Sequence, residues 1–139
     1  MLYFYHKSYE KIAMGLLSLS KDISDMNLIS QEINWYDTND SRSLYLWKND
    51  DQNWSGLVGI ELRNEQVIVH ELSLSPQELS QHNFDTMLSE LQMNYPDSKI
   101  VGDLDNAMIC MQWEKDRNSV ISEDESENDI VEPTDAEQF

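Results

Sequence analysis

Two adjacent titratable residues, His70 and Glu71, lie in a predicted strand at Val67–Leu74. Because strand side chains alternate, they are expected on opposite faces, with Glu71 on the side of the apolar Val67 and Val69. Burial on that side would raise the pKa of Glu71 and suit it to accept a proton during a reaction. The alternative is a carboxylate that is hydrogen-bonded within the strand and has no catalytic duty.

The segment after this strand has the layout of an anion site. Pro76 ends the strand, and the loop Gln77–Asn83 leads into a predicted helix. The apolar residues of that helix recur at helical spacing: Phe84, Met87, Leu88 and Leu91. A helix N-terminus offers N–H groups and the positive end of a dipole, so this loop is where a phosphate-bearing ligand would bind. His82 in the loop either donates to such a phosphate or is only solvated.

The rest of the chain predicts the elements that must position these residues. In chain order they are a strand at 2–6, helices at 8–20 and 22–36, strands at 43–48, 57–63 and 67–74, a helix from Phe84, a strand at 99–102, and a last helix that Asp103 or Asp105 caps and that ends near Lys115. Short polar connections should join the three middle strands into an antiparallel meander.

The composition indicates one acidic domain followed by an acidic tail. The 139 residues carry a formal charge of −18, and residues 117–139 hold eight acidic side chains against one basic side chain. Nucleic acid is a poor partner, because phosphate binding needs clustered Lys and Arg and the nine here are scattered. The segment 117–139 cannot bury enough surface to offset the entropy of ordering, so we predict a domain at 1–116 and a disordered tail.

Several features predict a cytoplasmic protein with no membrane partner and no metal. No apolar run approaches the roughly 20 residues of a membrane span, and the N-terminus lacks the pattern of a secretory signal. Cys110 is the single cysteine and lies in an apolar helix, so it should be a core residue and not a nucleophile. The three histidines, His6, His70 and His82, have no metal-ligand spacing.

The order of the elements resembles the GNAT superfamily of acetyl-coenzyme A dependent acyltransferases. The first helix narrows the resemblance, because Tyr5–Ser18 is similar to the start of the RibT-type proteins, which are associated with bacterial riboflavin operons. The segments Leu44–Lys48, Val58–Glu61 and Leu72–Pro76 line up with the same family in the same order.

The resemblance implies an α+β, three-layer, GNAT-like fold with a mixed, mostly antiparallel central sheet and helices on both faces. It also implies acetyl transfer from acetyl-coenzyme A to an amine or protein acceptor, with a possible link to riboflavin biosynthesis. The alternative is a GNAT-fold protein that has lost catalysis and acts as a binding or regulatory module. Homodimers are common for such folds, and the apolar region of Trp47 and Trp54 is a candidate surface for one.

In this family the loop after the fourth strand wraps the cofactor pyrophosphate, and its pattern R/Q-x-x-G-x-G/A lets the backbone approach closely. Here the pattern is absent: aligned from Pro76, Leu79 stands at the arginine position, and His82 and Phe84 stand at the glycine positions. Phe84 is better explained as a core residue of its helix. The cofactor contacts that the resemblance assigns fall on Leu72, Leu74, Gln77, Gln81, His82, Asn83 and Asn106.

The family also uses a carboxylate or histidine on or near the fourth strand as a base that removes a proton from the substrate amine. Glu71 and His70 occupy that stretch, so the resemblance makes them the candidate catalytic residues. A tyrosine in the last helix commonly protonates the departing thiolate. Trp113 stands at that position here, and its indole N–H is a poor acid.

Overall fold

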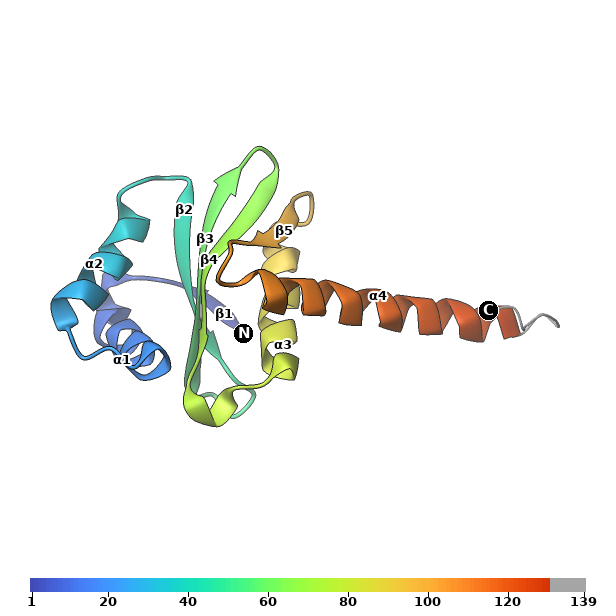
Figure 1. Cartoon of the computed structure of the whole chain (residues 1–139), viewed down its shortest axis with the longest axis horizontal. Helices are drawn as coiled ribbons and strands as arrows, with labels where there is room; N and C mark the ends of the chain where they lie inside the picture. Colours follow the sequence, from blue (N-terminus) through green and yellow to red (C-terminus); the bar gives the residue numbers. More distant parts are fainter. Residues whose placement is uncertain (131–139) are drawn as a thin grey trace.

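The computed structural model describes residues 1–130, and it contains one five-stranded sheet (Figure 1). The strands lie in chain order: β1 (Leu2–Phe4), β2 (Arg42–Lys48), β3 (Trp54–Arg63), β4 (Gln66–Leu74) and β5 (Lys99–Gly102). Neighbouring strands are antiparallel, except that β5 runs parallel to β4. The predicted mixed, mostly antiparallel sheet and its central meander are confirmed.

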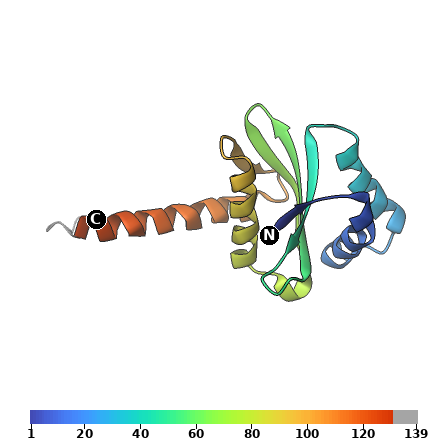
Figure 2. The same ribbon diagram turned by 180° about the vertical axis from the view of Figure 1, so that it is seen from behind.

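Helices cover both faces of this sheet. The helices α1 (Glu10–Lys21) and α2 (Met26–Asp37) lie on one face, and α3 (Gln81–Asn94) and α4 (Ala107–Ile130) lie on the other (Figures 1 and 2). Short 3-10 turns, η1 (Lys7–Tyr9) and η2 (Pro76–Glu78), precede α1 and α3. The arrangement confirms the predicted three-layer α+β fold.

The helices begin at different residues from those predicted: α1 at Glu10 and not at residue 8, and α4 at Ala107, after both predicted caps. For α2 and α3 the capping side chains explain the difference. The Asp25 carboxylate accepts hydrogen bonds from the N–H groups of Asn27 and Leu28, so α2 begins at Met26 and not at Asp22. Ser80 caps α3 in the same way, with its hydroxyl accepting from Asn83 N–H at 3.1 Å. The helix therefore starts within the predicted loop.

The sheet separates two hydrophobic clusters. One joins α1 and α2 to the sheet and includes Leu17, Ile33 and Leu57. The other joins α3 and α4 to the opposite face. β3 contributes to both, because Leu57 faces one cluster and Val58 the next, which makes β3 a strand buried on both sides. Burying such side chains contributes about 1.5–3 kcal/mol each, so the sheet is a stable support for any site along it.

A β-bulge in β4 overturns the predicted alternation of its side chains. Gly59 pairs with Glu71 and Ile60 with Val69, so His70 is an extra residue with no partner on β3. A bulge changes which face the following residues point to. Glu71 therefore lies on the α1–α2 face, opposite to Val67 and Val69, and not on their side as the alternation predicts.

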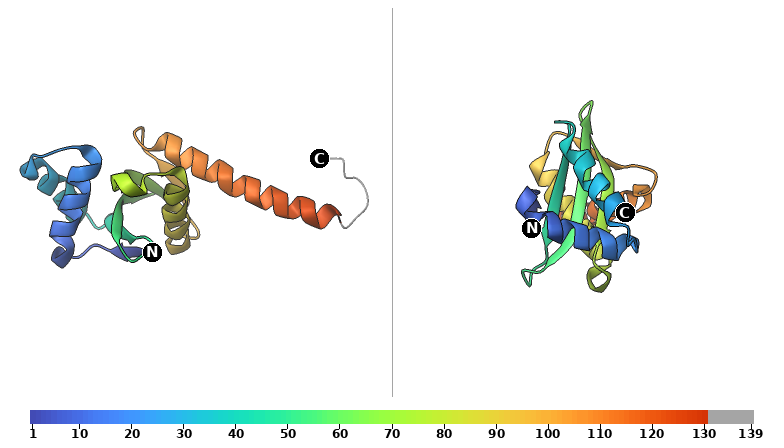
Figure 3. Two further views of the ribbon diagram at one scale, coloured as in Figure 1. Left: turned by 90° about the horizontal axis from the view of Figure 1, so that it is seen from below. Right: turned by 90° about the vertical axis from the view of Figure 1, so that its left-hand side faces the viewer.

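The last helix is longer than predicted. α4 continues past Lys115 and ends at Ile130, projecting away from the rest of the molecule (Figure 3). Residues 117–130 of the predicted tail are thus helical in the structure, while residues 131–139 lie outside the described residues. The boundary of the domain at residue 116 stays a prediction. Among residues 1–130, no helix has both the length and the apolar character that crossing a membrane requires.

Candidate active site

β4 and β5 separate halfway along β4. They pair from Gln66 and Lys99 to Val69 and Gly102, and Asp103 N–H donates to the Val69 carbonyl at 3.0 Å at the end of this ladder. The chain then turns into α4. Within the described residues, no strand takes the place of β5 beside the second half of β4, so that edge has backbone groups open to a ligand.

The carboxylate of Glu71 lies at this open half of β4. Its side chain is almost fully buried, the Ser73 hydroxyl donates a hydrogen bond to it, and Lys21 Nζ from α1 lies 3.5 Å from its Oε2. Burial raises the pKa of Glu71 above the usual carboxylate range, while the Ser73 hydrogen bond and the Lys21 charge partly offset that rise. A buried carboxylate of raised pKa next to an amine is suited to accept a proton from it.

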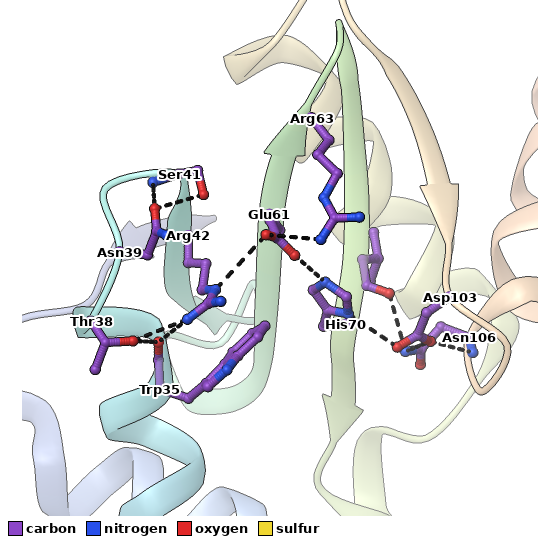
Figure 4. Close-up of polar contacts among 11 residues, drawn as sticks. Trp35, Thr38, Asn39, Ser41, Arg42, Glu61, Arg63, His70, Asp103 and Asn106 are labelled. Carbon is purple, nitrogen blue, oxygen red and sulfur yellow. Dashed lines mark hydrogen bonds and ion pairs between the residues drawn. The ribbon is translucent and has the colours of Figure 1, made fainter.

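His70 is held in a separate polar network, shown in Figure 4. Its Nε2 lies 2.9 Å from Glu61 Oε1, and its Nδ1 lies 3.3 Å from Asp103 Oδ2. The ring also packs edge-on against Trp35 of α2, with centroids 5.2 Å apart. The two ring nitrogens both face carboxylates, so neither is open to an incoming substrate. Of the two predicted catalytic residues, the geometry therefore suits Glu71 better.

Glu61 joins this network to β2 and β3. Arg63 Nη2 lies 3.4 Å and Arg42 Nε 3.9 Å from its Oε2, and Arg42 stacks on the Trp35 ring (Figure 4). The hydrogen bond from His70 and the nearby Arg63 lower the pKa of Glu61, against the effect of burial. The network ties β2, β3, β4 and the turn after β5 together at the point where β4 and β5 separate.

The predicted phosphate loop, Gln77–Asn83, contains the end of η2, the cap residue Ser80 and the first turn of α3. In residues 1–130 the backbone N–H groups of Gln81 and His82 have no protein acceptor, because the cap serves Asn83 and Phe84. His82 lines a cavity of about 290 Å³, whereas Gln81 does not. Its lining residues are Trp47, Asn49, Asp50, Asp51, Glu78, His82, Asn83 and Thr86.

This cavity has both favourable and unfavourable features for a pyrophosphate. The N–H group of His82 and the dipole of α3 favour an anion, whereas the carboxylates of Asp50, Asp51 and Glu78 oppose one. Leu79 does not fill the cavity, because it is 64% exposed and does not line it. Phe84 is buried in the core, as predicted.

The other predicted cofactor residues are mostly engaged in the fold. The side chains of Leu72 and Leu74 are core residues facing α3 and α4, so only their backbone can meet a ligand, and Gln77 is exposed. The amides make internal hydrogen bonds: Gln81 to Asp85 and Ile109, Asn83 to Glu78, and Asn106 to Asp103 and Val69.

Three further residues bear on the chemistry. Cys110 is buried, as predicted, and burial raises the pKa of its thiol to about 12, which rules out a nucleophilic role at neutral pH. Trp113 is also buried, and its indole N–H donates to Ser89 Oγ at 3.0 Å, so it cannot reach a ligand. Trp47 is buried as well, which removes it from the suggested dimer surface. A homodimer stays a prediction.

Sequence reasoning missed Tyr36. Its helical spacing marks it as a core residue, yet its hydroxyl is buried without a hydrogen-bond partner among the described residues. Its ring lies against Gly59, the residue that pairs with Glu71. Burial raises the pKa of this phenol far above its usual range. In the sequence, only Gly59 could have indicated this contact, since a glycine leaves room for a ring. Recognising it requires the register of β3 and β4, which the sequence does not give.

A second cavity, of about 310 Å³, lies between α1 and α2. Lys21 belongs both to this cavity and to the ion pair with Glu71, so the cavity approaches the candidate base from the helix side. Its walls combine apolar and charged groups: Leu17, Lys21, Ile23, Leu28, Ile29, Gln31 and Glu32.

The open edge of β4, the buried carboxylate and the helix that follows define a GNAT-like fold, and comparison with known proteins agrees. No protein-family model matches the chain. It is 35% identical over 115 residues to an uncharacterized N-acetyltransferase in the lysA 3′ region of Bacillus methanolicus, an alignment that covers 82% of this chain and 95% of the relative. The chain therefore belongs to the GNAT superfamily of N-acetyltransferases.

Solved structures support the same fold at low sequence identity. An aminoglycoside 6′-N-acetyltransferase, AAC(6′)-IG from Acinetobacter haemolyticus, has a TM-score of 0.62 at 11% identity, covering 83% of this chain and 88% of that chain. A spermidine N-acetyltransferase chimera of Vibrio cholerae SpeG and hSSAT has a TM-score of 0.60 at 13% identity, covering 83% and 78%. A Staphylococcus aureus GNAT family acetyltransferase has a TM-score of 0.59 at 11% identity, covering 73% and 83%.

Proposed function

We propose that this protein transfers an acetyl group from acetyl-coenzyme A to an amine, with Glu71 as the general base. The observation that carries the proposal is the buried Glu71 carboxylate at the open half of β4, in contact with an amine, that of Lys21. Family membership supports the reaction class. The names of two structural neighbours describe acetylation of amines, of aminoglycosides and of spermidine respectively.

The chain's own groups suggest how the co-substrate would be held. Unpaired backbone groups in the second half of β4, including those of Leu72 and Leu74, would meet the amides of the pantetheine arm. The free N–H groups of Gln81 and His82 would donate to the phosphates. The thioester supplies the activated acetyl group. Glu71 would take the proton that an amine must lose before it can attack.

The acidic cavity wall has a consequence for affinity. Asp50, Asp51 and Glu78 lie where phosphates would approach α3, so we expect acetyl-coenzyme A to bind more weakly than it would to a glycine-rich cradle. Raised ionic strength should screen this repulsion and tighten the binding. The alternative function is a catalytically degenerate binding module, which the family comparison does not favour. Absence of binding at millimolar acetyl-coenzyme A would support that alternative.

Calorimetry with acetyl-coenzyme A, followed by thiol release in the presence of amines, tests the proposal. The panel of amines contains spermidine, an aminoglycoside, a lysine peptide and amine-bearing riboflavin precursors. The riboflavin precursors are included because we also propose that the protein is of the RibT type and is linked to riboflavin biosynthesis. Glu71→Gln should still bind acetyl-coenzyme A, and its rate of acetyl transfer should be about 10²–10⁴-fold lower than that of the wild type. Glu65→Gln, in the exposed turn between β3 and β4, is the matched control. Wild-type rates in Glu71→Gln would reject Glu71 as the base.

A further inference from the structure

Lys21 occupies an unusual position for a surface lysine. It is the last residue of α1, its side chain is 42% exposed, and its Nζ reaches Glu71 Oε2 at 3.5 Å. Glu71 is almost fully buried, so the contact joins a solvent-accessible amine to a carboxylate inside the fold. The same side chain also lines the cavity between α1 and α2.

No other lysine of the described residues has such a partner. Lys7 pairs with Glu10, a partly exposed carboxylate one helical turn away. Lys48 lies over the rings of Tyr3 and Trp54. Among the lysines of residues 1–130, Lys21 alone contacts the buried carboxylate at the open half of β4. It therefore differs from the other lysines in having a candidate base beside its amine, and not only in its exposure.

We propose that Lys21 is an acetylation site of this protein, modified by the protein's own active site. The proposal rests on the proposed function, because it uses the same base and the same acetyl donor. The Lys21 amine lies where a substrate amine would lie to give its proton to Glu71, and the cavity beside it leaves room for the side chain to move. The chain's lysine is thus a built-in acceptor.

The chemistry balances without a further reactant. Glu71 accepts one proton from the Lys21 ammonium, and the neutral Nζ then attacks the thioester carbonyl. A nitrogen–carbon bond forms, the carbon–sulfur bond breaks, and coenzyme A leaves as a thiolate. The nitrogen loses a second proton as it becomes an amide, and the thiolate takes up this proton by way of solvent. The product is an uncharged amide at Lys21, so the ion pair with Glu71 is lost.

Site-resolved mass spectrometry tests the proposal. The full chain is incubated with isotopically labelled acetyl-coenzyme A, and the labelled fraction of each lysine is followed with time. Lys21 should acquire label at least tenfold faster than the more exposed Lys7. Its rate should not change on tenfold dilution of the protein, because the reaction is intramolecular. Protein isolated from cells should also carry more acetyl at Lys21 than at Lys7.

Variants separate the mechanism from simple accessibility. Glu71→Gln should remove the excess labelling of Lys21 and leave Lys7 unchanged. If that variant does not fold, Glu71→Asp, which shortens the carboxylate's reach, should lower Lys21 labelling in a folded protein. Labelling with acetyl phosphate, which needs no active site, supplies the ranking by exposure alone, with Lys7 ahead of Lys21.

The outcomes distinguish the two proposals. Acetyl transfer to a free amine without excess label on Lys21 overturns the self-acetylation and leaves the proposed function standing. Absence of acetyl-coenzyme A binding overturns both. Excess label that persists in folded Glu71→Gln would also overturn the inference, because it would show that Lys21 reacts without the base. Lys21→Arg, which keeps the positive charge, should abolish the labelled peptide while still binding acetyl-coenzyme A.

Discussion

Replacement of Gly59 by alanine tests the contact between Tyr36 and β3 beside Glu71. A Cβ at this position would overlap Cζ and Oη of Tyr36 and lie 2.6 Å from its Cε1. The Tyr36 ring is 4% exposed and packed in the cluster beneath α2, so it cannot turn away without moving that helix. Forcing extra volume into a packed core typically costs about 1–3 kcal/mol, and overlap of the new Cβ with a rigid, buried ring belongs at the upper end.

Gly15 provides a matched control in the same chain. A Cβ there would meet nothing within 4 Å, and the residue lies inside α1. Gly15→Ala should therefore stabilise the protein by roughly 0.5–1 kcal/mol, because alanine loses less backbone entropy in a helix. The two substitutions add the same methyl group and should move stability in opposite directions.

Urea unfolding followed by circular dichroism measures both effects as changes in the midpoint at constant slope. Gly59→Ala should lower the free energy of unfolding and Gly15→Ala should raise it. A Gly59→Ala protein within about 0.5 kcal/mol of wild type would refute the reasoning, since surface substitutions commonly fall in that range. It would mean that Tyr36 does not lie against β3 beside Glu71.

Three further predictions follow from the same contacts. Tyr36→Phe removes a buried hydroxyl that has no partner among residues 1–130, so unfolding free energy should stay the same or rise, and a loss above about 1 kcal/mol would reveal a missed partner. Asp25→Ala removes the cap of α2 and should cost about 0.5–2 kcal/mol in urea, against little change for the exposed Ser24→Ala.

The third concerns pH: burial raises the pKa of Glu71, so the folded state binds its proton more readily than the unfolded chain. This contribution makes stability fall as pH rises above about 4.5, the carboxylate's ordinary value, and Glu71→Gln should flatten that slope. The acid limb of the acetyl-transfer rate should likewise lie above pH 4.5, and a limb at or below it would contradict the raised pKa.

The helical stripes and the meander were predictable because they depend on local periodicity. Residues such as Ile29 and Ile33, or Met87 and Leu91, recur at the helical period and are buried where that period predicts. Helix ends were less predictable, because Asp25 and Ser80 act as caps only once the backbone before them is extended.

For the site, the sequence by itself determined which residues were candidates and in which strand they lie. It placed His70 and Glu71 on β4 and the possible phosphate donors after Pro76, since both follow from residue order. Only the tertiary structure decided their roles. The bulge opposite Gly59 turned Glu71 toward Lys21, and carboxylates from β3 and from the turn after β5 enclosed His70. The contacts of Glu71 with Lys21 and of His70 with Asp103 join residues distant in the chain, and that of His70 with Glu61 depends on the register of β3 and β4, so no local pattern encodes them.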